Sequence, residues 1–151
     1  MKKNTIIKIV VALLVTAGLY LTFKLLNPPI TESGDKSIHI IVEVANEDKS
    51  TTIIFDQVIK TDTEMLADLL LELDEKDELA VTLTGNASDP YGRSLTAIAD
   101  YAIEDWASGP WWLYNSDTNP ECLAAGFCPG VDSCPIYDND RFVFSFTSEF
   151  K

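Results

Sequence analysis

The sequence lacks most of the groups on which enzyme active sites depend. It has one histidine, His39, which stands in a predicted strand far from the three cysteines. It has no Gly-x-Ser-x-Gly motif, no glycine-rich phosphate-binding loop and no histidine-bearing metal motif. Carboxylate pairs are frequent, but in a chain with 24 acidic residues such pairs do not indicate acid–base catalysis. We therefore predict that the protein is not an enzyme.

Basic residues are also scarce, with 11 Lys and Arg against 24 Asp and Glu. Four of the eleven lie before Asn27, at positions 2, 3, 8 and 24, where no acidic residue occurs. The chain from Asn27 onward thus has seven basic and 24 acidic residues, a formal charge of −17. Such a surface repels phosphate backbones and anionic lipid headgroups, which excludes nucleic acid and leaves neutral or cationic ligands. The simplest role of this charge is to keep the domain soluble.

The N-terminus has the long apolar run of the chain. Residues 6–26 are almost wholly apolar, and at about 1.5 Å per residue they can cross a hydrocarbon core of about 30 Å. The lysines that precede this run predict a cytoplasmic N-terminus and place the rest of the chain outside. We predict that residues 1–26 are a single-pass anchor, or uncleaved signal, in the cell membrane. Cleavage near Val15-Thr16-Ala17 is the alternative, although the apolar run continues beyond it.

Residues 27–36 are typical of a linker, because two prolines and a Ser-Gly pair stand among acidic residues. An extracytoplasmic domain would then occupy residues 37–151. A length of this size is normal for one small domain.

Strand and helix patterns alternate within that domain. Thr61 and Glu64 fit a capping box for a helix that points Met65 and its leucines inward and ends near Asp74. Residues 94–102 fit either a short strand or a partly helical segment. The predicted order is an α+β fold, β-grasp-like, with one helix packed across a mostly antiparallel sheet. Five stretches have the composition of strands: 37–44, 51–58, 78–84, 111–114 and 142–146.

Short motifs in this domain resemble a known family. They are Gly92-Arg93-Ser94-Leu95-Thr96-Ala97-Ile98, Trp112-Leu113-Tyr114-Asn115, Gly130-Val131-Asp132 and Asp138-Asn139-Asp140-Arg141-Phe142. Over residues 38–146 their order resembles the bacterial domain related to the C-terminal β-domain of transcobalamin and intrinsic factor, in the soluble-ligand-binding β-grasp group. The resemblance implies a β-grasp fold with a face that lies against one side of a corrinoid such as cobalamin. Where the family tends to have Asp-Gly-Asp, this chain has Asp138-Asn139-Asp140. Asparagine tolerates the left-handed conformation, so Asn139 can replace the glycine of this turn.

Aromatic residues close to the C-terminus are the candidate contacts. Trp111 and Trp112 are neighbours in a predicted strand, so they point to opposite faces, and one should be exposed or covered by the cysteine-containing loop. An exposed ring would give a ligand a flat surface for stacking. The alternative function is a cell-surface protein-interaction or adhesion module that uses the same face to bind another envelope protein. The candidate binding residues are Trp111, Trp112, Tyr114, Asn115, Asp132 and Tyr137.

Three cysteines fall in one loop, with five residues between neighbours: Cys122, Cys128 and Cys134. In a domain outside the cell a disulfide is expected there, and Cys122–Cys128 would close a loop that contains Gly126. One of the three is left over, and the sequence alone does not decide the pairing. A metal site of three thiolates is disfavoured, because short paired-cysteine spacing and a neighbouring histidine are both absent.

Asn115, Asp117, Asn119 and Glu121 alternate in the manner of the oxygen ligands of a calcium loop. However, Pro120 occupies the place where such a loop needs glycine, and no glutamate stands at its twelfth position. Ordinary turn chemistry accounts for the Asn and Asp residues without a metal. We therefore predict no metal and no cofactor, with cobalamin considered as a ligand.

Overall fold

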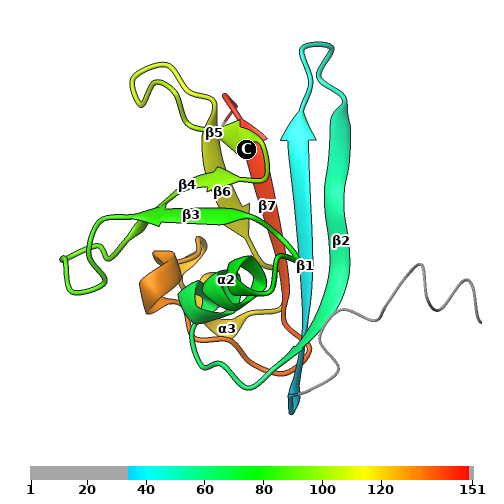
Figure 1. The fold of residues 1–151 in the computed structure, drawn as a ribbon, viewed down its shortest axis with the longest axis vertical. Helices are drawn as coiled ribbons and strands as arrows, with labels where there is room; N and C mark the ends of the chain where they lie inside the picture. Colours follow the sequence, from blue (N-terminus) through cyan, green and yellow to red (C-terminus); the bar gives the residue numbers. More distant parts are fainter. Residues whose placement is uncertain (1–33, 150–151) are drawn as a thin grey trace, which may run out of the picture.

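The computed structural model describes residues 34–149, which form two β-sheets and two α-helices. The first sheet has the order β2–β1–β7–β6 (Figure 1). It comprises β1 (Lys36–Ala45), β2 (Thr51–Thr61), β6 (Trp111–Asn115) and β7 (Arg141–Thr147). β1 and β7 run parallel at its centre, and the two outer pairs are antiparallel.

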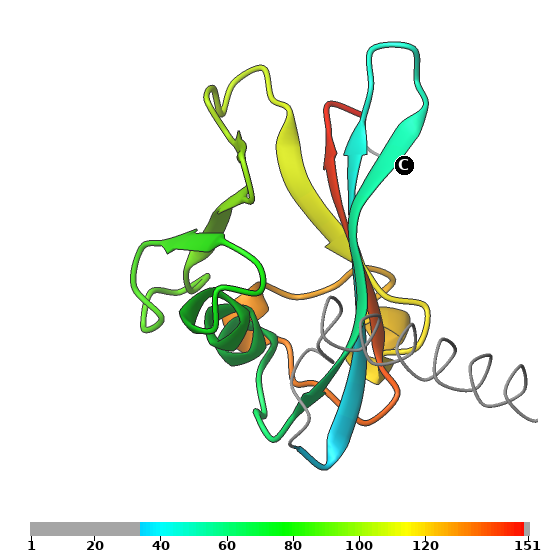
Figure 2. The same cartoon turned by 45° about the vertical axis from the view of Figure 1, so that its right-hand side comes forward.

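The second sheet is antiparallel and consists of β3 (Val81–Thr84), β4 (Ser94–Ile98) and β5 (Tyr101–Ala102). β4 and β5 form a hairpin whose turn includes Ala99 at a φ of 49°. This hairpin resolves the ambiguity of residues 94–102 in favour of strand. In Figure 2 this sheet and α2 (Leu66–Glu75) lie to the left of the four strands, and α3 (Pro120–Ala125) lies to the right.

The α+β class expected from the sequence is confirmed, with β-sheet as the larger part. The predicted anchor, residues 1–26, and most of the linker lie outside the described residues. Within residues 34–149 no helix has the length and apolar character needed to cross a membrane.

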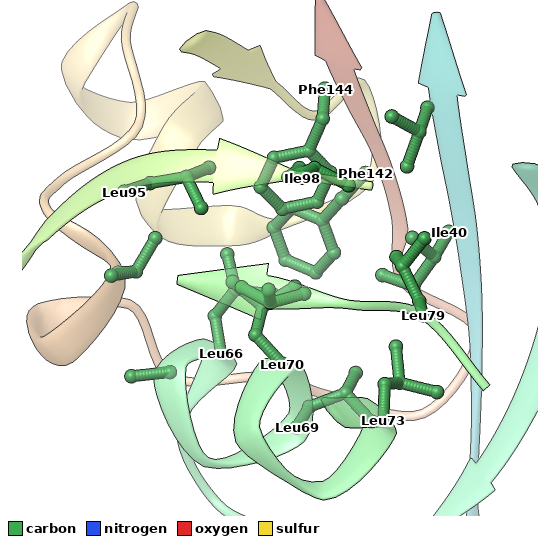
Figure 3. Packing of buried hydrophobic residues seen from close by; sticks show 14 of the residues in the cluster. Ile40, Leu66, Leu69, Leu70, Leu73, Leu79, Leu95, Ile98, Phe142 and Phe144 are labelled. Atoms are coloured by element: carbon green, nitrogen blue, oxygen red, sulfur yellow. The ribbon is translucent and has the colours of Figure 1, made fainter. Parts of the chain in front are cut away.

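One hydrophobic core joins α2 to both sheets (Figure 3). Four leucines of α2 recur at helical spacing and are fully buried. They pack below Phe142 and Phe144 of β7 and near Ile98 of β4 (Figure 3). Each such side chain contributes about 1.5–3 kcal/mol through its removal from water. The leucines are Leu66, Leu69, Leu70 and Leu73.

The capping box predicted at the start of α2 is wrong. The helix begins at Leu66, after Met65, and no side chain caps it. The Leu66 amide donates instead to the Cys134 carbonyl at 2.9 Å, because the chain around Pro135 pairs with Met65 in an isolated β-bridge. Thr61 ends β2, and its buried hydroxyl donates to Glu72 at 2.6 Å. A tertiary contact has therefore replaced the local cap.

The third predicted strand begins later than expected. Residues 78–80 do not belong to β3, because the amides of Glu78 and Leu79 donate to the Leu73 carbonyl at 3.0 and 3.3 Å. These bonds satisfy the carbonyl at the end of the helix. The strand starts at Val81, whose amide donates to Asp74 at 2.9 Å.

A second helix, α3, lies where the sequence predicted only a loop. Asn119 is its N-cap, Pro120 occupies its first turn, and Gly126 ends it at a φ of 77°. Asparagine before proline and glycine at the end are standard helix boundary signals, so this helix was detectable from the sequence. A 3₁₀ turn, η1 (Val131–Ser133), follows.

The closing turn before β7 agrees with the sequence prediction. Asn139 has a φ of 68°, in the left-handed region. Its amide donates to the Ser37 carbonyl at 2.9 Å, and the Ser37 amide donates to Asp138 at 2.8 Å. The turn thereby fixes the start of β1 beside the start of β7.

Candidate functional site

The face of the first sheet that turns away from α2 carries a pocket of about 330 Å³. Residues alternate between the two faces of a strand, so the neighbours of the core residues form the floor of this pocket. The floor comes from three adjacent strands and from the start of β2. We call it the outer-face pocket, and its floor consists of Glu43, Ala45, Thr51, Leu113, Asn115, Ser145 and Thr147.

The wall of the pocket is the short segment after α3, Gly126, Phe127 and Cys128. The predicted disulfide joins Cys122 to Cys128 and closes the loop that ends in this wall. Phe127 is 71% exposed, so its ring is available to a bound molecule. Cys134 is the unpaired cysteine; it is buried, and burial raises the pKa of its thiol to about 11. The disulfide expected in this loop is thus confirmed, and the structure decides the pairing that the sequence left open.

The pocket has carboxylates and no basic side chain among its lining residues. Glu43 accepts a hydrogen bond from the Ser145 hydroxyl at 2.6 Å, which places its carboxylate on the floor. Glu149 lies at the rim, 3.8 Å from Lys49 in an exposed ion pair. The negative carboxylates favour a cationic or neutral group and disfavour an anion.

The two tryptophans point in different directions, as strand alternation requires. Trp112 is 7% exposed, packs on Phe146 with ring centroids 4.9 Å apart, and donates from its indole to the Tyr101 carbonyl at 3.0 Å. Trp112 therefore belongs to the core.

Trp111 is half-buried on the other face and does not line the pocket. Its indole donates to the Trp106 carbonyl at 3.0 Å. Its ring lies against Gly109, where a Cβ atom would approach the ring to 2.8 Å. The loop before β6, and not the cysteine-containing loop, therefore makes these contacts with Trp111.

Tyr114 stands between the core and the pocket. Its ring stacks on Phe144 at 5.2 Å, and its hydroxyl donates to the Pro129 carbonyl. Burial, with a contribution from Cys134, raises the pKa of Tyr114 well above its usual range. Tyr114 also lines the outer-face pocket beside Asn115. These two residues are the candidates from the sequence that the pocket brings together.

Asp132 and Tyr137 lie outside the lining of the pocket. Asp132, in η1, accepts hydrogen bonds from the Arg93 amide at 2.6 Å and from the Arg93 Nε at 3.1 Å. These bonds lower the pKa of the Asp132 carboxyl. The Tyr137 hydroxyl lies 3.4 Å from Glu121. Both residues therefore have contacts with other segments of the protein.

Three of the polar residues that alternate from Asn115 to Glu121 have protein partners, namely Asp117, Asn119 and Glu121. Asn119 is fully buried, and its side-chain oxygen accepts from the Glu121 amide at 3.0 Å. Its side-chain nitrogen donates to Asp140 at 2.6 Å. Asp117 lies 3.4 Å from Arg141. Among residues 34–149 no three His, Cys, Asp or Glu side chains are grouped so that they could hold a metal ion.

The sequence reasoning missed Glu43, Leu113 and Phe127 as pocket residues. A signal exists for Glu43, because a charged residue within an apolar strand faces away from the core. Leu113 follows from the alternation that places Trp112 inside. Nothing local identifies Phe127, which the disulfide-closed loop brings to the sheet.

No family model and no curated protein matches the sequence. Among solved structures, the chain is similar to a crystal structure from Ruminococcus gnavus ATCC 29149 whose description reads "putative metal binding protein". The identity is 21%, the TM-score is 0.47, and the match covers 74% of this chain and 98% of that chain. That description is a statement about the R. gnavus protein only.

Proposed function

We propose that this protein is a membrane-anchored, extracytoplasmic β-grasp domain that binds a neutral or cationic small ligand, with a corrinoid such as cobalamin as the leading candidate. The outer-face pocket carries the proposal. It is concave, it combines the apolar Leu113 and Phe127 with hydroxyl and carboxylate groups, and such a combination is typical of ligand sites.

The assignment of the α+β fold to the β-grasp type is supported by the strand topology. A hairpin, a helix on one face of the sheet, and a last strand that lies parallel to the first are the parts expected of a β-grasp. The extracytoplasmic location is supported by the disulfide, because disulfides persist in oxidising compartments. The anchor itself rests on the apolar sequence of residues 6–26.

The size of the pocket limits how a corrinoid would bind. Ligand pockets range from about 300 to 1,000 Å³, so a pocket of about 330 Å³ is at the small end. A corrinoid would place one edge in the pocket and rest its ring against Phe127, with its other side uncovered. The choice of a corrinoid is supported by the sequence resemblance, and the pocket chemistry is compatible with it.

The test is isothermal titration calorimetry of the full-length chain in detergent with cobalamin and with cobinamide. We expect saturable binding that Phe127→Ala weakens at least several-fold, because the substitution removes the aromatic wall. Tyr91→Ala is the matched control, since Tyr91 is 90% exposed and does not line the pocket.

Two results would contradict the proposal in different ways. If a folded chain gives no binding heat with either corrinoid, the corrinoid is excluded. If binding is saturable but equal in Phe127→Ala and wild type, the ligand binds elsewhere and the pocket is excluded. A protein partner is the second candidate function, because Leu123 of α3 and Phe127, both within the segment closed by the disulfide, are 59% and 71% exposed.

A further inference from the structure

β2 is an open edge of the first sheet over the described residues. It pairs with β1 on one side, and no strand within residues 34–149 pairs with its other side. It is 11 residues long and carries two exposed apolar side chains, Ile53 at 57% and Val58 at 55%. A long edge strand without proline is a template for another strand, and proteins usually protect such edges.

The hydrogen bonds of β1 show which residues of β2 face this edge. The His39 amide donates to the Asp140 carbonyl at 2.8 Å, so the odd-numbered residues of this part of β1 bond toward β7. The even-numbered residues therefore bond toward β2, where Ile38 pairs with Ile59. It follows that the even-numbered residues in 56–60 of β2 point their amides and carbonyls to the open edge.

We propose that a second copy of this chain pairs with this edge, β2 against β2, antiparallel about a two-fold axis at Val58. In this register Val58 lies opposite the partner's Val58. Asp56 lies opposite the partner's Lys60, and Lys60 opposite the partner's Asp56. These even-numbered residues have their free backbone groups at the edge, so the two strands can exchange hydrogen bonds.

Charge selects this register over its neighbour. Moving the axis to Asp56 would set two aspartates opposite each other, and like charges directly opposite are destabilising. The axis at Val58 forms two opposite-charge pairs on either side of an apolar contact. Within one copy, Asp56 Oδ1 lies 2.6 Å from His39 Nε2, and Lys60 Nζ donates to Ser37 Oγ at 2.6 Å. Both charged groups therefore lie on the same face of β2 as Val58.

The two pairs of Asp56 with Lys60 across the edge also offset the repulsion between the negative charges of the two copies. The chain from Asn27 onward has a formal charge of −17, which repels a second copy at long range. A local attraction near Val58 is therefore needed for pairing. The pocket floor uses the other end of β2, at Thr51, so the pairing is independent of ligand binding.

The first test is disulfide cross-linking of the full-length chain in membranes. We expect Val58→Cys to give a disulfide-linked dimer on a non-reducing gel after mild oxidation. Ile53→Cys is the matched control, because Ile53 is equally exposed on the same strand. In the proposed register the two copies of residue 53 are about 33 Å apart, at about 3.3 Å per residue, and should not cross-link.

The second test is charge reversal in the Val58→Cys background. Asp56→Lys or Lys60→Asp alone sets like charges opposite each other, and we expect the dimer yield to fall several-fold. The double change restores opposite charges between the two copies. It does not restore the contact of residue 56 with His39, which the Asp56→Lys single variant has lost as well, so a recovered yield reports the pairing between copies. We therefore expect the double variant to recover the yield.

Three outcomes would overturn the proposal. Equal cross-linking of Val58→Cys and Ile53→Cys would show random collision. A double variant that stays as weak as the single variants would exclude the register. A Val58→Cys chain that stays monomeric and unreactive to maleimide would show that residues of the same chain cover the edge.

Discussion

Asp132 shows how one carboxylate can join two distant segments. The Arg93 amide and guanidinium both donate to it, and the two residues are 39 positions apart. The side chain of Asp132 is 9% exposed, so these bonds are shielded from water. Gly92 allows this approach, because a Cβ atom there would come within 2.8 Å of Asp132. The contact holds η1 against the start of β4.

We expect Asp132→Asn to lower the free energy of unfolding at pH 7 by about 1–3 kcal/mol, since hydrogen bonds to a charged group are lost. Arg93 lowers the pKa of Asp132 in the folded state. The stabilisation is therefore present above the unfolded-state pKa of about 3.9 and is lost as pH falls through the lower, folded-state pKa. The measurement is urea unfolding of both proteins at pH 7, 5 and 3.

The difference between wild type and Asp132→Asn should shrink at pH 3. A difference that is constant from pH 7 to 3 would contradict the role of the charge. Asp117→Asn is the control, because Asp117 and Arg141 form an exposed ion pair at 3.4 Å. Its effect should be below about 0.5 kcal/mol at every pH.

At the scale of an element, α3 depends on one buried amide. The Asn119 oxygen caps the helix through the amides of Glu121 and Cys122. The Asn119 nitrogen supplies a donor to Asp140, which is 3% exposed. The same side chain thus begins the helix and compensates a buried carboxylate. α3 in turn carries the disulfide-closed loop whose Phe127 forms the pocket wall.

We expect Asn119→Ala to destabilise the protein by about 2–4 kcal/mol, because both the cap and the donor to Asp140 are lost. Asn119→Asp separates the two roles, since it keeps an oxygen for the cap but offers no donor and adds a second carboxylate. We expect it to be at least as destabilising at pH 7 in chemical denaturation. An Asn119→Asp protein with the stability of wild type would show that only the cap matters.

At the scale of the whole molecule, the two sheets and α2 share one core. Leu70 of α2, Ile98 of β4 and Phe144 of β7 belong to the same buried cluster (Figure 3). Since neither sheet has a separate core, loss of packing at α2 should affect both. The described domain should therefore unfold as one cooperative unit.

We expect Leu70→Ala to cost about 2–5 kcal/mol, because it removes buried methyl groups and leaves a cavity. Unfolding followed by tryptophan fluorescence, which reports Trp111 and Trp112 in the first sheet together with Trp106, should coincide with unfolding followed by far-ultraviolet circular dichroism. Two separate transitions would contradict a shared core. Leu123→Ala, at a residue that is 59% exposed, should leave stability nearly unchanged.

Sequence patterns were sufficient to predict those structural features that depend on residues close together in the chain. The hairpin of β1 and β2, the inward leucines of α2 and the left-handed Asn139 follow from strand alternation, helical spacing and turn chemistry. Local signals of the same kind at Asn119, Pro120 and Gly126 mark α3, where the sequence analysis predicts only a loop. The failed cap at Thr61 is different, because a carbonyl 68 residues beyond Leu66 satisfies the helix amide.

The sequence by itself thus determined the α+β class, the acidic surface, the expectation of a disulfide among the three cysteines and which residues of each strand share a face. The structure decided that the disulfide joins Cys122 to Cys128. Only the tertiary structure decided that β7 lies parallel to β1, which brings Ser145 to Glu43 across 102 residues. The pocket depends on this pairing, and so does the open edge of β2. The reason is physical: local patterns depend on near neighbours, whereas strand order depends on how the whole chain buries its apolar surface.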